Sequence, residues 1–150
     1  MPTIRLETQI NAPMEMVFDM ARDVDVHART VPHTRERALD VGDGRRLGPG
    51  DTVTFEAVHF CVRQRLTARI TAFQRPTLFA DEMVRGAFGS LRHTHTFEAN
   101  AAGTLMRDTL EFTSPLGLLG RLADRLFLER YMRRFLQIRN ANLKRLAEEA

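Results

Sequence analysis

The sequence predicts an α+β fold in which a curved antiparallel sheet of about seven strands wraps around a long C-terminal helix. Three observations support this fold class. Residues 3–113 contain several segments in which apolar and polar side chains alternate between short turns, a pattern typical of strands with one buried and one solvated face. Two short helical segments follow the first of these strands. Residues 121–150 contain neither Pro nor Gly and repeat their apolar residues with helical spacing.

The composition indicates one globular domain over residues 1–150. The chain is 43% hydrophobic, and a chain of this length buries roughly 70% of its unfolded surface. Its single cysteine, Cys61, excludes an internal disulfide and a multi-cysteine zinc site. The sequence has no secretory signal and no apolar run of about 18 residues. We therefore expect a cytoplasmic protein that does not insert into a membrane.

The charge pattern argues against nucleic-acid binding. The formal net charge is +3, and all 22 basic residues except Lys144 are arginine. Most arginines alternate with apolar residues in the predicted strands or lie among the charges of the C-terminal helix, whereas nucleic-acid-binding domains gather basic residues in a patch. We therefore expect solvated arginine faces, and a monomer or homodimer that does not bind nucleic acid.

The N-terminal third begins with a half-buried strand over residues 3–10, in which Ile4, Leu6 and Ile10 share one side. Asn11 is then positioned to cap a first helix that runs to about residue 22. Asp23 is positioned to cap a second short helix, which ends before Pro32.

From residue 34 onward the pattern predicts an antiparallel meander. The predicted strands cover residues 34–41, 51–60, 62–73, 78–85, 90–99 and 104–113. The segment 42–50, rich in Gly and Arg, is a connecting loop, and Cys61 lies at the tip of a hairpin. A sheet with one dry face needs a cover, and the C-terminal helix supplies it.

Two apolar stripes divide the C-terminal segment. Tyr131, Phe135 and Ile138 share one helix face, whereas Arg139 and most other charges fall on the opposite faces. The second stripe, which includes Leu119, Leu122 and Leu126, lies more than a quarter turn away from the first. We therefore expect a separate short segment over residues 116–125 and a long helix from about residue 124. Tyr131, Phe135 and Ile138 are predicted to line a cavity between helix and sheet. The predicted gate is formed by Leu119, Leu122 and Leu126.

The clearest polar group lies on the last two strands. Leu91, His93, His95 and Phe97 share one strand face, opposite Arg92 and Thr94. Because the turn at residues 100–103 pairs Ala99 with Thr104, it also places His95 opposite Asp108. Directly opposed side chains lie about 5 Å apart at Cβ. The sequence therefore predicts an inward-facing, hydrogen-bonded pair of His95 and Asp108, with His93 two residues away.

This pair has three interpretations. It is a buried polar lock on strand register, a polar contact for a ligand, or a general acid/base. A metal site is the weakest option. His93, His95 and an acid could supply ligands, but no fourth ligand is evident, so we expect no metal and no cofactor. Either Asp81 or Glu82 joins the cluster, and a single bulge decides between them.

Several segments, taken in order, resemble the SRPBCC proteins, the START/Bet v 1-like helix-grip superfamily of ligand-binding domains. They include Ile10-Asn11-Ala12-Pro13, Gly50-Asp51, Gly86-Ala87-Phe88, His93-Thr94-His95-Thr96-Phe97 and Pro115-Leu116-Gly117. The chain is most similar to the bacterial polyketide cyclase/dehydrase-like group, and departs from it in having Ala87 where proline is expected. The resemblance implies a helix-grip fold with a hydrophobic tunnel that binds lipids, polyketides, quinones or similar molecules.

Three functions follow from these expectations. The first is a carrier that binds a hydrophobic small molecule, the second a cyclase, dehydratase or isomerase that uses His95 and Asp108, and the third a protein-interaction module. The loop at residues 42–50 is the only hint of the third. The residues expected to contact a ligand are His93, His95, Asp108, Phe55, His59, Leu66, Phe97, Leu110, Tyr131, Phe135 and Ile138.

Overall fold

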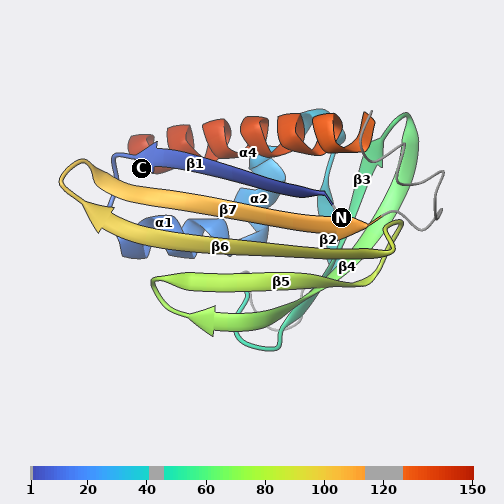
Figure 1. Cartoon of the computed structure of the whole chain (residues 1–150), viewed down its shortest axis with the longest axis horizontal. Helices are drawn as coiled ribbons and strands as arrows, with labels where there is room; N and C mark the ends of the chain where they lie inside the picture. Colours follow the sequence, from blue (N-terminus) through green and yellow to red (C-terminus); the bar gives the residue numbers. More distant parts are fainter. Residues whose placement is uncertain (1, 41–45, 114–126) are drawn as a thin grey trace.

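The computed structural model describes residues 2–40, 46–113 and 127–150. Its centre is a seven-stranded sheet in the order β1-β7-β6-β5-β4-β3-β2, with every neighbouring pair antiparallel (Figure 1). The strands are β1 (Thr3–Ile10), β2 (Arg37–Asp40), β3 (Thr52–His59), β4 (Val62–Gln74), β5 (Leu78–Arg85), β6 (Ser90–Asn100) and β7 (Gly103–Thr113). The predicted α+β fold class is confirmed.

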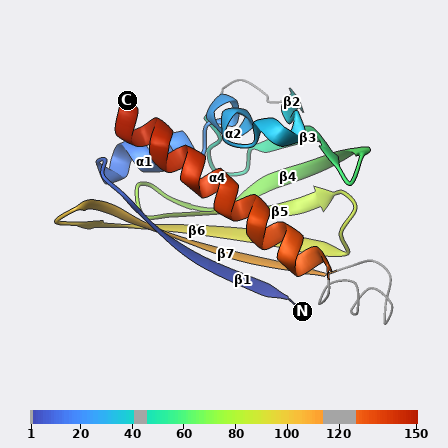
Figure 2. The ribbon, with the colours of Figure 1, turned by 90° about the horizontal axis from the view of Figure 1, so that it is seen from above.

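The helices cover one face of this sheet. The long helix α4 (Glu129–Glu149) lies diagonally across the strands, and α1 (Met14–Ala21) and α2 (Val24–Thr30) lie beside it (Figure 2). The sheet curves around α4, so that β1 lies along one side of the helix and β2 and β3 rise on the other (Figure 2). None of the described helices is long and apolar enough to cross a membrane.

The two short helices begin differently. Asp23 caps α2 as predicted, because its carboxylate accepts hydrogen bonds from the backbone N–H groups of Asp25 and Val26. The predicted Asn11 cap is wrong, since α1 starts after Pro13 and has no side-chain cap. The Asn11 backbone N–H instead donates to the Glu148 carboxylate, which ties the start of the chain to the end of α4.

The strand expected from residue 34 is shorter than predicted. Pro32–Thr34 forms a 3-10 turn, and Arg35 adopts a left-handed conformation with φ of 53°, so β2 begins only at Arg37. This bend turns Glu36 toward the interior, where its side chain lies beside α2.

The turn between β6 and β7 fixes the register of the central hairpin. Gly103 has φ of 124°, and a Cβ atom there would lie 2.3 Å from the Ile10 carbonyl oxygen, so only glycine fits. Ala99 pairs with Thr104 and, four residues before, His95 pairs with Asp108. The predicted register of these two strands is confirmed.

The larger of two apolar core clusters lies at the α1 end of the sheet. Phe18 is completely buried, and its ring packs edge-on against Phe73, Phe79 and Phe97 at centroid distances of 5.2–5.5 Å. Such aromatic pairs contribute about 0.5–1.5 kcal/mol each beyond area burial. A second buried cluster of Ile4, Leu91, Leu110, Phe112 and Leu136 packs toward the other end, where some of its residues border a cavity.

The buried face of α4 differs from the predicted one. The apolar residues that it buries are Leu136, Leu143 and Ala147, while Tyr131, Phe135 and Ile138 are only partly buried. Arg139, expected on a solvated face, is 3% exposed. The prediction followed the aromatic residues, whereas the helix turns its smaller aliphatic residues toward the sheet.

Candidate functional site

A cavity of about 540 Å³ lies between the curved sheet, α2 and α4. Its wall is mostly apolar and includes Phe55, Leu66, Leu110 and Phe135. The polar side chains of the wall gather mainly in two places, on β5 and β6 and around α2. The main polar members of the wall are His27, Glu36, His59, Gln64, Asp81, His93, His95 and Arg139.

Most of the predicted ligand-contacting residues reach this cavity. Its wall contains His93, His95, Phe55, His59, Leu66, Leu110, Tyr131 and Phe135. Phe97 instead packs in the core against Phe18, and Asp108 lies behind the two histidines. Ile138 lies outside the wall, because the face of α4 turned toward the cavity carries Phe135, Leu136 and Arg139. The predicted gate residues Leu119, Leu122 and Leu126 fall outside the described residues.

Asp108 connects the two histidines of β6, but not through the hydrogen bond that was predicted. His93 Nε2 lies 2.8 Å from Asp108 Oδ1 and forms the hydrogen bond. His95 Nδ1 is 3.2 Å from the same oxygen, yet it lacks hydrogen-bond geometry to any described residue. The hydrogen bond of His95 runs from Nε2 to Asp81 Oδ2, at 3.3 Å.

Asp81, rather than Glu82, therefore joins the cluster. Strands β5 and β6 pair Asp81 with His93 and Glu82 with Arg92. Burial opposes ionisation of the Asp81 carboxyl, but the hydrogen bond from His95 and the nearby His93 outweigh it and lower its pKa. Stacking holds the imidazoles in place, since the His95 ring lies 4.2 Å from the Phe79 ring and 3.8 Å from the His93 ring.

Helix α4 supplies the remaining partners of Asp108. Arg139 Nη1 donates to Asp108 Oδ1 at 3.1 Å, and Asn140 Nδ2 donates to Oδ2 at 2.7 Å. Burial alone would raise the pKa of Asp108, but its hydrogen bond to His93, its contact with His95 and the Arg139 charge hold that pKa well below its usual range. The pKa of His93 is lowered, because burial and the neighbouring His95 outweigh the two carboxylates.

His27 and Glu36 form a second polar group on the cavity wall. His27 Nε2 lies 3.2 Å from Glu36 Oε2, although Glu36 Oε2 has no hydrogen-bond partner among the described residues. Burial, assisted by the Arg139 charge, lowers the pKa of His27 to about 3. Burial also raises the pKa of Glu36 to about 8, against the opposing effect of Arg139. At neutral pH both groups are therefore uncharged, and the short distance does not represent an ion pair.

Aromatic side chains surround the open end of the cavity. His59 Nδ1 shares a hydrogen bond with the Tyr131 hydroxyl, joining β3 to α4. The Phe60 ring packs against Tyr131 in a tilted arrangement, with ring centroids 4.4 Å apart, while remaining 58% exposed. Phe127 is 72% exposed. The β3–β4 turn that presents Phe60 has positive φ at both Phe60 and Cys61, as a two-residue hairpin turn of type I′ requires.

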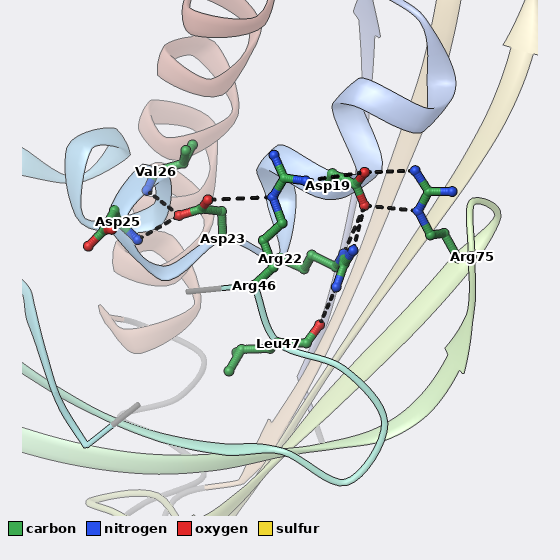
Figure 3. Close-up of polar contacts among 8 residues, drawn as sticks. All are labelled: Asp19, Arg22, Asp23, Asp25, Val26, Arg46, Leu47 and Arg75. Carbon is green, nitrogen blue, oxygen red and sulfur yellow. Dashed lines mark hydrogen bonds and ion pairs between the residues drawn. The ribbon is translucent and has the colours of Figure 1, made fainter. Parts of the chain in front are cut away.

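A cluster of charges around Asp19 braces the wall nearest α1 and α2 (Figure 3). The Asp19 carboxylate accepts hydrogen bonds from Arg22 and from Arg75 at the end of β4. Arg22 also donates to the Leu47 carbonyl. These contacts lower the pKa of Asp19 to about 2, chiefly through Arg75. The cluster holds Arg22 and Leu47, both part of the cavity wall, against the sheet.

The sequence analysis did not anticipate Glu36, Arg139 and Asn140 as site residues. No local sequence pattern indicates that Glu36 is buried, because an irregular bend turns it inward. For Arg139 and Asn140, such a pattern existed. Met132, Leu136, Leu143 and Ala147 recur at spacings of three and four or their sums, and two polar residues in the middle of such a stripe indicate buried partners.

The fold is shared with solved structures of low sequence identity. A protein of Thermus thermophilus is 21% identical with a TM-score of 0.79, covering 96% of this chain and 95% of the other. The Zhui aromatase/cyclase of a Streptomyces species is 18% identical with a TM-score of 0.79, covering 98% and 93%. A START superfamily protein of Mycobacterium smegmatis is 13% identical with a TM-score of 0.73, covering 98% and 97%.

Comparison with curated proteins gave no match. The sequence profile of the family described as "Polyketide cyclase / dehydrase and lipid transport" matches residues 1–148. That match spans all the strands and polar groups described above, the helices α1 and α2, and all of α4 except its last residue. The chain belongs to this polyketide cyclase/dehydrase and lipid transport family.

Proposed function

We propose that this protein binds and carries a hydrophobic small molecule, such as a lipid, a polyketide or a quinone, between the sheet and α4. The observation that carries the proposal is the cavity of about 540 Å³ with a mostly apolar wall, a size and character typical of small-molecule sites. The family's description includes both lipid transport and polyketide chemistry, which supports the same class of ligand.

The distribution of polar groups suggests how such a ligand is oriented. The apolar body packs against Phe55, Leu66 and Phe135, while a hydroxyl or carbonyl group reaches His93 or Asp81. A small number of placed polar groups in an apolar wall gives orientation and specificity rather than most of the affinity. We expect a ligand with one polar end.

Native mass spectrometry of the freshly purified protein tests this proposal. Ala57 is 5% exposed and lines the cavity, so Ala57→Phe places a large ring in the ligand volume. Val84 is 54% exposed and lies outside the wall, which makes Val84→Phe the matched control. We expect a co-purified mass on the parent and the control, and a reduced fraction of it on Ala57→Phe.

Two results would contradict the carrier function. One is the absence of a co-purified molecule together with no binding of lipids, polyketides or quinones added to the purified protein. The other is equal occupancy of the parent and a folded Ala57→Phe variant, which would place the ligand elsewhere.

A second candidate is an enzyme of the cyclase, dehydratase or isomerase type. The observation that favours it is that His93 and His95 both line the cavity while Asp108 contacts both imidazoles from behind. A carboxylate that orients an imidazole is the arrangement of a general acid/base, and the apolar wall excludes water. The structural likeness to an aromatase/cyclase agrees with this candidate.

Exchanging His95 for Ala separates the alternatives. A carrier is expected to lose at most some affinity, an enzyme to lose turnover of a polyketide or similar substrate, and a register lock to lose mainly stability. Circular dichroism, ligand titration and a turnover assay on the same preparation distinguish these outcomes. Normal folding, binding and turnover in this variant would remove His95 from all three roles.

We also infer that the protein works in the cytoplasm, as a monomer or homodimer without a nucleic-acid partner. The exposed free thiol of Cys61 supports a reducing compartment. Sedimentation equilibrium measures the oligomeric state directly, and a larger assembly would contradict this inference.

A further inference from the structure

Asp81, His93 and His95 bring three potential metal-ligating atoms together. One atom from each residue lies within 4.8 Å of the other two. His93 and His95 alternate on β6 and therefore point to the same side of the sheet, and Asp81 is the cross-strand partner of His93 on β5. Two neighbouring strands thus present two imidazoles and one carboxylate at one point of the cavity wall.

We propose that these residues bind a divalent transition-metal ion of the zinc(II) or iron(II) class. Imidazole and carboxylate together suit these ions. His95 Nε2 lies 3.3 Å from Asp81 Oδ2, which matches the separation of about 3.3–3.4 Å between two ligands bonded at about 2.0–2.1 Å in a tetrahedron. The expectation of no metal rested on the lack of an evident fourth ligand, and an ion held by three protein ligands leaves its fourth position to water or to the bound molecule.

Asp108 is placed as the carboxylate that orients both metal-binding imidazoles. It hydrogen-bonds His93 Nε2 at 2.8 Å and lies 3.2 Å from His95 Nδ1. The nitrogens left for the ion are His93 Nδ1 and His95 Nε2. Metal-bound histidines characteristically contact such a carboxylate through their other ring nitrogen. Arg139 and Asn140 fix Asp108 in turn.

The local charge balance also favours a cation. Within the described chain, Arg139 donates to Asp108 and forms no hydrogen bond or ion pair with Asp81. The charge of an Asp81 carboxylate therefore has only the His95 imidazole as a bonded partner there. A divalent ion neutralises this charge, and because the three ligands line the cavity, its remaining coordination positions face the bound molecule.

Cobalt(II) and zinc(II) are the probes for this site, used with the full chain in a Cys61→Ser background, since the exposed thiol would itself bind metal. The protein is stripped with a chelator, dialysed, and titrated with Co²⁺ by absorption spectroscopy and with Zn²⁺ by calorimetry. We expect one ion per chain and intense visible Co²⁺ bands of a four- or five-coordinate site. Asp81→Asn should weaken binding by about 100-fold or more.

His33→Gln is the matched control, because His33 is exposed and lies outside the cavity wall. It should bind as the parent does. Failure of the parent to bind, or equal affinity in parent and Asp81→Asn, overturns the proposal. If Asp81→Asn does not fold, NMR of the parent decides: Co²⁺ must shift the ring protons of His93 and His95, and unshifted signals reject the site. The test does not depend on the hydrophobic ligand.

Discussion

Two polar groups at the cavity, one around Asp108 and one around Glu36, contain similar residue types. The carboxyl group is ionised in the first and neutral in the second. On β6 and β7, Asp108 receives bonds from His93, Arg139 and Asn140, and its pKa stays well below the usual range despite burial. Beside α2, Glu36 has a histidine 3.2 Å away but no hydrogen bond among the described residues to its buried Oε2, and its pKa rises to about 8.

The comparison shows that the supply of hydrogen bonds, rather than burial, decides which carboxyl group is charged. Both carboxyl groups are nearly inaccessible, with side-chain exposures of 0% for Asp108 and 7% for Glu36. Arg139 lowers the pKa of each, but its guanidinium is bonded to Asp108. A buried carboxylate with several donors remains ionised, while one without them takes up a proton.

The largest expected effect comes from removing the charge of Asp108. Asp108→Asn leaves the buried Arg139 without its counter-charge, and such a loss costs roughly 3–5 kcal/mol of unfolding free energy. Urea denaturation followed by circular dichroism measures it. The double variant Asp108→Leu/Arg139→Met should recover a large part of this stability, because it removes both charges. A loss below about 1 kcal/mol in Asp108→Asn would contradict this view of the cluster.

The contribution of the His27–Glu36 pair to stability is predicted to have a plateau in its pH dependence. His27 has a folded pKa of about 3 against 6.5, so its contribution is lost as pH falls from 6.5 toward 3. Glu36 has a folded pKa of about 8 against 4.5, so its contribution is lost as pH rises from 4.5 toward 8. The two slopes, each about 1.4 kcal/mol per pH unit, cancel between pH 4.5 and 6.5.

Above this plateau only Glu36 contributes, so stability should fall by about 2 kcal/mol between pH 6.5 and 8. Glu36→Gln, which does not titrate, should abolish the fall, and His27→Gln should leave it in place. Urea midpoints measured from pH 4 to 8.5 test both variants. A parent protein whose stability is constant from pH 6.5 to 8 would show that Glu36 is already ionised in the fold.

The smallest effect is expected on the outer face of the sheet. Arg107 donates to Glu98 at 3.0 Å, but the two side chains are 48% and 64% exposed. An exposed pair of this kind contributes about 0–1 kcal/mol. Glu98→Gln should therefore change the urea midpoint far less than Asp108→Asn, although both substitutions remove one carboxylate. Equal losses would mean that the comparison between buried and exposed carboxylates does not hold.

Part of the site followed from the strand pattern alone. Alternation sends side chains to opposite faces with a period of two, and a turn of known length transfers that pattern to the next strand. This is why the pairing of His95 with Asp108 was predictable. The choice between Asp81 and Glu82 was not predictable. The pairing of β5 with β6 ends at Glu82 and Arg92, so the residues around the 86–89 turn lie outside the ladder and the turn does not fix its register.

The helix illustrates the opposite situation. Its hydrophobic periodicity predicted that Tyr131, Phe135 and Ile138 face the sheet, but the buried positions include Arg139 and Asn140. By hydrophobic periodicity alone, both polar residues are expected to face solvent. Their burial becomes favourable only because Asp108, more than 30 residues earlier, offers a charged acceptor for each.

The sequence by itself determined the order of the elements, the strand β1 (Thr3–Ile10), the strand β5 (Leu78–Arg85) and the antiparallel pairing of β6 with β7. These features depend on local alternation, caps and turns, which involve residues that are close together in the sequence. Only the tertiary structure decided which face of α4 is buried, which acid joins the histidines, and that His27 and Glu36 are uncharged. Those outcomes depend on partners distant in the chain, whose hydrogen bonds set the free energy of burying a polar group.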